Sequence, residues 1–243
     1  KISLPSLARA FPKSKLWISS GQWSFPFDLP SSWLGLPPSR TKVLFDDGLP
    51  HSEDCTWHPL GPVNIGLGCF QEISCFHKPT KSLFVTDALV GISSIPPEIF
   101  DFDPTPLLFH SRDSGDELLE DSEIARRKGW ARVVLFASFL RPSVLSIPTF
   151  RNIFKTILKP GVRNPKAHFG LYPFDWNTNW HNSAKDLLGV SKPKIQVPPV
   201  LERLVFPRAK KTFLDWLDKI EKIKGIQWLI PAHYSAPVSF KLK

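Results

Sequence analysis

Two kinds of hydrophobic spacing divide this sequence, and together they restrict it to folds that combine sheet with helix. Between residues 41 and 87 the apolar residues form short runs of strand length. These runs are Lys42–Phe45, Cys55–Leu60, Glu72–His77 and Ser82–Thr86. The last two are joined by the Lys-Pro-Thr-Lys segment at residues 78–81, which suits a hairpin turn. We therefore expect an antiparallel block here.

Helical spacing dominates the second half of the chain. Helices are predicted at Glu123–Leu140, Thr149–Leu158 and Pro207–Lys224. The last has Pro in its first turn and is followed by Gly225, a residue that favours helix ends. A buried strand is predicted at Gln227–Ile230, and the chain turns away from its end at His233. The pattern indicates an α/β fold with mixed layers.

The N-terminal part predicts a short helix near Pro5–Phe11 and a strand near Leu16–Ser19. Between them and the antiparallel block, aromatic residues alternate with prolines too irregularly for either helix or strand. The aromatic residues are Trp23, Phe25, Phe27 and Trp33. We expect an ordered loop whose rings cover one face of a sheet.

Composition favours one soluble domain. The 243 residues are 42% hydrophobic, which suffices for a substantial core, and the 25 prolines are scattered rather than clustered. No apolar run reaches the roughly 18 to 20 residues of a membrane-spanning helix, and no signal peptide opens the sequence. Because Met is absent, we expect Lys1 to follow further chain rather than to be a natural start.

The cysteines indicate a reducing compartment. Cys55, Cys69 and Cys75 are odd in number and lack the C-x-x-C spacing of zinc ribbons, so a disulfide framework is not expected. Each is interpreted as a small buried apolar residue in or near a strand.

Charge is distributed in blocks of one sign. The formal net charge is +9, and residues 151–166 hold five basic residues and no acid, whereas residues 113–123 hold six acids. Arg151, Lys155 and Lys159 recur every four residues along the predicted helix. This stripe suits phosphate groups, an anionic membrane surface or an acidic protein partner, or it is simply a solvated helix face. No nucleic-acid-binding motif is present.

Six segments carry a family resemblance. They are GQWSFPFDLPSSWLGLP (21–37), LGPVNIGLGCFQEISCFHKPTKSLFVTDALV (60–90), PLLFHSRD (106–113), RRKGWARVVLFASFLRPS (126–143), FGLYPFDW (169–176) and IPAHYSAP (230–237). With them the chain resembles, over essentially its whole length, the family catalogued as domain of unknown function 4336. That family is found in cyanobacteria and plastids and is distantly similar to metallo-β-lactamases.

The resemblance implies a metallo-β-lactamase-like fold, a four-layer αβ/βα sandwich with a metal site at one edge of two facing sheets. It further implies zinc or iron as the metal and a chloroplast location, in the stroma or at the stromal face of the thylakoid. Asp87, in SLFVTDAL, stands at the position of the bridging Asp, and His233, in LIPAH, at that of the final His. The N-terminal strands and the His-rich loop of the superfamily would precede Lys1.

The sequence departs from the superfamily where a Gly-His-Thr turn is expected. Residues 60–64 read Leu-Gly-Pro-Val-Asn instead, and His58 is the nearest imidazole. His58 and His110 are kept as further candidate ligands, with Asp113 as a carboxylate that could orient His110. His77 is expected to end the strand before the hairpin.

Each leading candidate also has a purely structural interpretation. Asp87 follows an apolar strand, where a carboxylate can bind metal or act as a base, or can instead cap the next turn. His233 can present an imidazole to a cation or be a hydrogen-bonded structural residue. We expect the two side chains to approach each other at the rim of the sheets.

Two functions remain open at this point. The first is a metal-dependent hydrolase, intact or degenerate, that acts on an ester, thioester, lactone or phosphodiester. Asp87 and His233 would then be catalytic and ligating residues. The second is a non-catalytic assembly factor or accessory subunit of a larger chloroplast complex, because a fold alone does not decide function.

Overall fold

The computed structural model describes residues 4–20, 29–64, 66, 68–138, 144–190 and 192–240. The chain divides into two compact units, of which the first comprises Lys1–Val90 and Val197–Lys243 and the second Gly91–Gln196. None of the helices in the described ranges has both the length and the apolar character that a bilayer span requires. That the whole chain is one domain stays a prediction.

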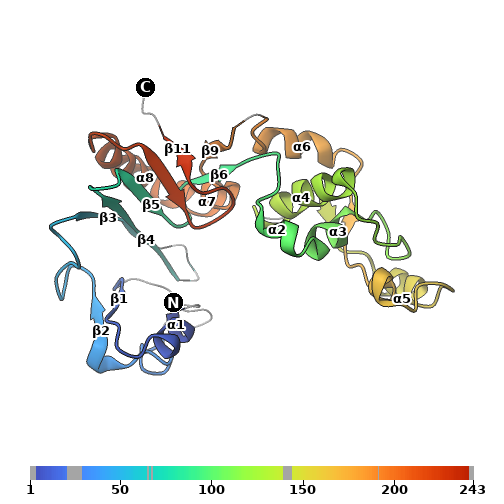
Figure 1. The fold of residues 1–243 in the computed structure, drawn as a ribbon, viewed down its shortest axis with the longest axis horizontal. Helices are drawn as coiled ribbons and strands as arrows, with labels where there is room; N and C mark the ends of the chain where they lie inside the picture. The colour runs from blue at the N-terminus through green and yellow to red at the C-terminus, as the bar shows by residue number, and fades with distance from the viewer. Residues whose placement is uncertain are drawn as a thin grey trace. The chain divides into compact units, whose positions relative to one another are not determined.

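A five-stranded sheet forms the centre of the first unit, in the order β11-β10-β5-β4-β3 (Figure 1). Its strands are β3 (Cys55–Asn64), β4 (Cys69–His77), β5 (Ser82–Val85), β10 (Trp228–Pro231) and β11 (Val238–Ser239). β4 pairs antiparallel with both β3 and β5, whereas β5 and β10 are parallel. The antiparallel pairing of β3, β4 and β5, the turn at residues 78–81 and the strand near residues 227–230 are confirmed. The prediction was wrong for the run Lys42–Phe45, which overlaps β2 (Thr41–Val43) and pairs parallel with β1 (Leu16–Ile18) in a separate sheet.

Helix α8 (Phe206–Glu221) packs against β3, with α7 (Pro199–Leu204) beside it. The helix buries Phe213, Trp216 and Ile220. The Trp216 indole N–H donates to Ser74 Oγ on β4 at 3.2 Å. Because alternate residues of a strand point to opposite faces, Glu72 and Phe76 share the helix-covered face with Ser74. The predicted helix is thus confirmed, although it ends at Glu221 rather than Lys224.

The N-terminal part of the first unit contains a two-stranded parallel sheet of β1 (Leu16–Ile18) and β2 (Thr41–Val43). Helix α1 (Leu4–Ala10) precedes β1, and the short η1 (Pro38–Arg40) precedes β2. The Arg40 guanidinium donates to the carbonyls of Ala8, Phe11 and Ser14. It therefore satisfies acceptors that the end of α1 leaves open. Residues 21–28 of the predicted aromatic loop lie outside the described residues.

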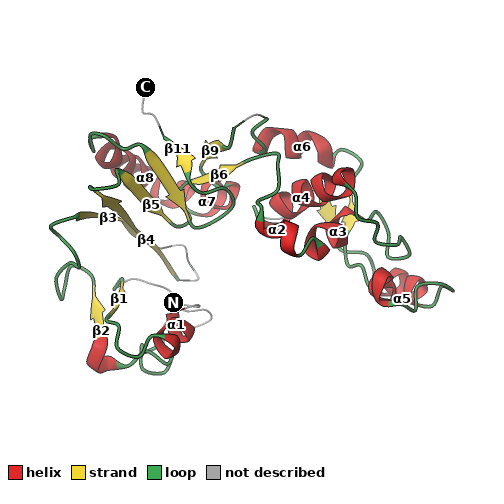
Figure 2. Ribbon diagram, viewed as in Figure 1, coloured by secondary structure: helices red, strands yellow, loops and turns green. Residues whose placement is uncertain are grey.

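The second unit is mainly helical (Figure 2). Its helical segments are α2 (Ile99–Phe102), α3 (Thr105–Ser111), α4 (Glu123–Ala137), α5 (Phe150–Ile157), η2 (Pro165–Gly170) and α6 (Trp180–Leu187). Two short sheets join β6 (Val90–Ile92) to β9 (Lys194–Gln196) and β7 (Leu145–Ser146) to β8 (Asp175–Trp176). Gly129 of α4 lies directly against the Leu107 carbonyl of α3, so any larger residue there would separate the two helices.

The chain is therefore mixed α/β. Its described residues contain one five-stranded sheet, three two-stranded sheets and eight α-helices. The helices predicted near residues 5–11, 123–140 and 149–158 are present as α1, α4 and α5. The more specific prediction, an αβ/βα four-layer sandwich with additional strands before Lys1, stays a prediction.

Candidate functional site

Asp87 and His233 meet at one edge of the five-stranded sheet. β5 and β10 are parallel neighbours, so their carboxyl ends lie at the same edge, and each residue follows the end of its strand by two positions. The Ala232 N–H donates to the Val85 carbonyl at 3.0 Å, and this bond holds together the segments that follow the two strands. His233 Nε2 lies 3.0 Å from Asp87 Oδ1, and both side chains are about half exposed. The structure thus brings together the two residues that the sequence singled out.

The turn that carries Asp87 is fixed by a buried carboxylate. Glu72 of β4 is only 3% exposed, and its two oxygens accept the backbone N–H groups of Thr86, Asp87 and Ala88 at 2.8, 2.8 and 2.6 Å. Burial raises the pKa of Glu72, whereas these three N–H bonds lower it and the charge of Asp87 raises it. Glu72 therefore positions the backbone of Asp87 and leaves the Asp87 carboxylate available to bind another group.

Sequence analysis missed this role of Glu72, which it treated only as the first residue of a strand. The signal available was its alternation with Ser74 and Phe76, because an acid on the inward face of a strand needs partners. Which groups become those partners depends on where β5 ends. The alternation within β4 does not predict that end.

An apolar hollow of about 450 Å³ adjoins the pair. It is lined by Trp57, Ile73, Cys75, Phe84, Val85, Thr86, Ile230, Pro231 and Ala232. Two of these, Thr86 and Ala232, directly precede the paired residues, so the Asp87–His233 pair lies at the end of the hollow. Burial, then the neighbouring Cys55, raises the pKa of Cys75 to about 12, which keeps it a neutral thiol rather than a nucleophilic thiolate.

The other histidines of the first unit that the sequence raised have local partners. His58 Nε2 lies 3.0 Å from Thr56 Oγ1 on β3. Burial, followed by the charge of Lys219, lowers its pKa. β4 separates β3 from β5, so His58 stands two strands from the Asp87 turn, roughly 10 Å at usual strand spacing. His77 ends β4 as expected, and its Nδ1 lies 2.7 Å from Thr80 Oγ1 in the hairpin turn.

His110 lies in the second unit, at the end of α3, among aromatic rings. Phe109, Phe136 and Phe174 have ring centroids within 6 Å of its imidazole, at 5.4, 5.7 and 4.9 Å. Burial, followed by the charges of Arg132 and Arg112, lowers the pKa of His110 to about 4. Asp113 does not orient this imidazole. Its carboxylate instead binds Arg132 at 2.5 Å and Lys128 at 2.7 Å.

Two buried arginines organise the surroundings of His110, and sequence analysis missed both. Arg112 and Arg132 are each 1% exposed. Arg132 donates to the carbonyls of His110, Ser111 and Arg112, at the end of α3. Its guanidinium also lies over the rings of Trp176 and Trp180, at 5.0 and 4.7 Å from their centroids. The bonds to carbonyls join α4 to the end of α3, and the ring contacts join α4 to β8 and α6.

Arg151 and Lys155 of the basic stripe lie on α5 in the second unit, and Lys159 lies two residues beyond the end of that helix. Arg151, Lys155 and Lys159 are all exposed. Lys159 Nζ binds Asp116 Oδ2 at 2.7 Å, so one residue of this stripe pairs with the acidic block at residues 113–123.

A family model described as Domain of unknown function (DUF4336) matches residues 1–243. The chain belongs to the DUF4336 family. No curated protein and no solved structure matches this DUF4336 chain. Its distant similarity to metallo-β-lactamases and its plastid location accordingly stay predictions.

The donor atoms of this DUF4336 chain suit a metal in kind. Imidazole nitrogen and carboxylate oxygen are both ligands of zinc and of iron. Two donors that share one ion at about 2.0–2.2 Å lie roughly 3 to 3.5 Å apart. The 3.0 Å between His233 Nε2 and Asp87 Oδ1 falls in this range. In the ranges that the structure describes, however, no group of three or more His, Cys, Asp or Glu side chains could hold a metal. The described donors are therefore an incomplete set.

Proposed function

We propose that Asp87 and His233 are two ligands of a divalent-cation site, in a metallo-β-lactamase-like hydrolase located in the chloroplast. The observation that carries this proposal is the 3.0 Å approach of His233 Nε2 to Asp87 Oδ1 at the ends of adjacent parallel strands. Zinc or iron is the expected ion, and the described residues supply two of its donors. When bound, such an ion supplies a nucleophile at neutral pH by acidifying water.

Residues of this chain have three separate tasks in this proposal. Glu72 holds the backbone of the Asp87 turn through three N–H bonds, so the position of the Asp87 carboxylate at the sheet edge is fixed. The β5–β10 ladder holds His233 at the same edge. The apolar hollow beside the pair accommodates the non-reacting part of a substrate. An ester, thioester, lactone or phosphodiester with an apolar group fits these features.

Metal titration of the full-length protein tests the proposal. Zn²⁺, Fe²⁺ and Mn²⁺ are added to the wild type and to the variants Asp87→Ala and His233→Ala, and affinity is measured by calorimetry. Each variant is expected to weaken the tightest site by at least about tenfold. His51→Ala, which changes an exposed histidine elsewhere in the first unit, is the matched control. A wild type that binds none of the three ions, or unchanged affinity in both variants, would rule the site out.

A second candidate function is a non-catalytic assembly factor or accessory subunit of a chloroplast complex. The open face of the sheet favours it, because Phe84 and Trp228 are 44% and 41% exposed there. Exposed aromatic residues around an apolar hollow are typical of protein contact surfaces. Affinity capture from stromal and thylakoid extracts, with Phe84→Ser as the comparison, tests this function. Capture that persists unchanged in the variant would count against it.

A further inference from the structure

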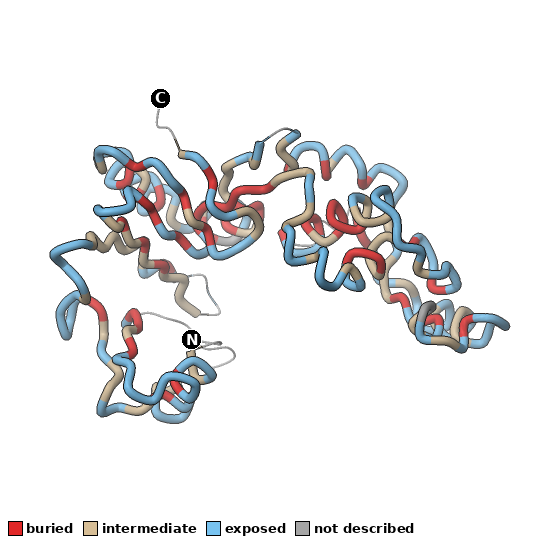
Figure 3. Tube along the Cα trace, viewed as in Figure 1, coloured by how far each residue is buried: buried red, intermediate tan, exposed pale blue. Residues whose placement is uncertain are grey.

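Helix α5 presents apolar and basic side chains to solvent side by side. The α5 patch consists of Phe150, Arg151, Phe154 and Lys155 of α5 together with Leu158 and Lys159, which directly follow its end. Its three apolar members are 81%, 62% and 70% exposed, in chain order. They recur every four residues, so they form one stripe, and each is followed directly by a basic residue of the neighbouring stripe. No residue of α5 is buried, and Figure 3 colours the backbone by this burial.

Helix α5 packs against the rest of its unit, although the patch is exposed. On the opposite side of α5, Ile153, Thr156 and Ile157 are half-buried. A Cβ added to Gly170 would lie 3.0 Å from the Ile157 Cα, so the backbone of η2 packs closely against this inner side. The helix therefore already has an inward face that holds it to its unit. The α5 patch is a second, outward face.

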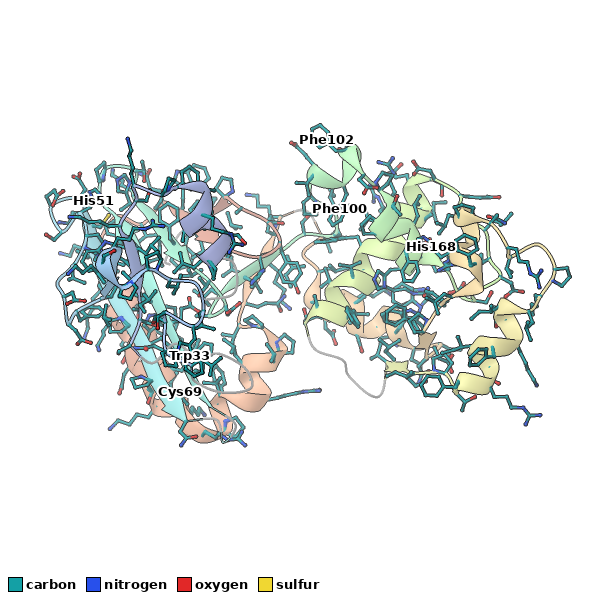
Figure 4. All side chains as sticks on the ribbon, turned by 90° about the horizontal axis from the view of Figure 1, so that it is seen from below. Trp33, His51, Cys69, Phe100, Phe102 and His168 are labelled. Carbon is teal, nitrogen blue, oxygen red and sulfur yellow. The ribbon has the colours of Figure 1, made fainter. Side chains whose placement is uncertain are left out.

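The charge of the patch is strongly biased. Residues 151–166 contain five basic residues and no acid. Lys159 is paired with Asp116, but the described residues place no carboxylate in an ion pair with Arg151 or Lys155. A different exposed ring in the same unit gives the contrast. Phe102, at the end of α2, is 91% exposed and stands between Asp101 and Asp103 (Figure 4).

We propose that the α5 patch docks this protein on the surface of an anionic lipid bilayer. Phenylalanine and leucine side chains enter the interface between headgroups and acyl chains, and the adjacent long cations extend to lipid phosphates. An eight-residue helix is about 12 Å long, far short of the ~30 Å hydrocarbon core, so α5 lies in the plane of the surface.

A lipid surface suits this pattern better than a protein groove does. A groove encloses an apolar stripe and requires separate carboxylates at fixed positions for each cation. In the α5 patch every apolar residue has a cation as its next neighbour, and a layer of mobile phosphates meets that arrangement without fixed partners. Because the patch is in the second unit and the Asp87 turn in the first, this proposal does not depend on the metal site.

Vesicle flotation of the full-length protein tests the docking. Vesicles of phosphatidylcholine alone are compared with vesicles that contain about one third phosphatidylglycerol, in 0.1 and 0.5 M NaCl. The wild type is expected to bind the anionic vesicles at least tenfold more tightly and to lose most of that preference in high salt. The double variant Arg151→Gln/Lys155→Gln should weaken binding roughly 25-fold, or about fivefold for each cation.

Two further variants test whether vesicle binding depends on the apolar residues of the α5 patch or on any exposed aromatic ring. Phe150→Ser/Phe154→Ser is expected to weaken binding to anionic vesicles by at least about tenfold. The control Phe102→Ser removes a ring that is even more exposed but is flanked by acids, and it should leave binding unchanged. Circular dichroism and unfolding midpoints confirm that each variant is folded.

Three outcomes would overturn the docking proposal. The first is wild-type protein that binds neither vesicle. The second is a Phe102→Ser variant that loses as much affinity as the α5 variants. The third is capture of an acidic protein from extract that depends on the α5 patch while vesicle binding is absent, which would assign the patch to a protein partner instead.

Discussion

The two units each contain a histidine and an aspartate that the sequence marked as a candidate pair, yet only one pair forms. In the first unit His233 and Asp87 lie 3.0 Å apart at a sheet edge, with both side chains about half exposed. In the second unit His110 is embedded among aromatic rings and Asp113 binds Arg132. The difference shows that spacing along the chain matters less than where each residue leaves its strand or helix.

The buried charged residues of the two units also differ in the backbone groups that they bind. Glu72 in the first unit binds only backbone N–H groups of one turn, and so prepares the position of the residue next to it. Arg132 in the second unit binds the carbonyls that end α3 and so joins two helices. A buried charge can therefore serve either a surface site or the core, and substitutions should separate the two.

The largest expected effect is on the stability of the second unit. Arg132→Met keeps an apolar chain of similar length but removes the donor to the carbonyls of His110 and Ser111, so the free energy of unfolding should fall by about 3–5 kcal/mol. The Arg112 carbonyl keeps the Tyr172 hydroxyl and Asp113 keeps Lys128. Arg127→Met on the same helix, where the ion pair with Glu123 is exposed, should cost about 0.5 kcal/mol or less. Urea unfolding of both variants measures this. An equal loss of unfolding free energy in the two variants would mean that the buried contacts of Arg132 add nothing to stability beyond those of an exposed arginine.

A pH titration of stability distinguishes His110 from an exposed histidine. Its pKa falls from 6.5 to about 4 on folding, so between these values the unfolded state binds more protons than the folded state. The free energy of unfolding should therefore decrease as pH drops from 6.5 toward 4, by at most about 3 kcal/mol. His110→Phe should remove this part of the pH dependence. Parallel curves for wild type and variant would contradict a neutral buried imidazole.

Glu72→Gln tests the support of the Asp87 turn. The amide has one acceptor oxygen in place of two, so at least one of the three N–H groups loses its partner, at a cost of about 1–3 kcal/mol in the free energy of unfolding. Hydrogen exchange of the amides of residues 86–88 should accelerate selectively. Unchanged exchange at these three amides would show that the turn holds its shape without the carboxylate.

The smallest effect on stability is expected at the candidate site itself. Asp87→Asn and His233→Gln disrupt only an exposed pair, which should change the free energy of unfolding by about 0.5 kcal/mol or less. A loss of several kcal/mol in chemical denaturation would instead make the pair a structural element, and the contrast between the two units would fail.

The sequence predicts much of this fold because its signals are local. Alternation and turn chemistry locate β4, β5 and their hairpin, and helical spacing locates α8. Asp87 and His233 are predicted because the family resemblance places them at ligand positions and because each lies just beyond a short apolar strand. The roles of Glu72 and Arg132 are not predictable in this way, since their partners are backbone groups of segments distant in the chain. Helix α8 ends at Glu221 rather than at the predicted Lys224, because helix ends fray and local spacing does not define them sharply. The predicted end of α4 at Leu140 lies outside the described residues.

Histidine-selective ¹⁵N NMR of the full-length protein during Zn²⁺ addition tests the central claim most directly. His233→Gln assigns the ring signals, and Asp87→Asn probes the second ligand. We predict that the Nε2 signal of His233 shifts as Zn²⁺ binds and that Asp87→Asn weakens this response by at least about tenfold. A His233 signal that does not move while zinc binds elsewhere, or a response unchanged in Asp87→Asn, would contradict the account.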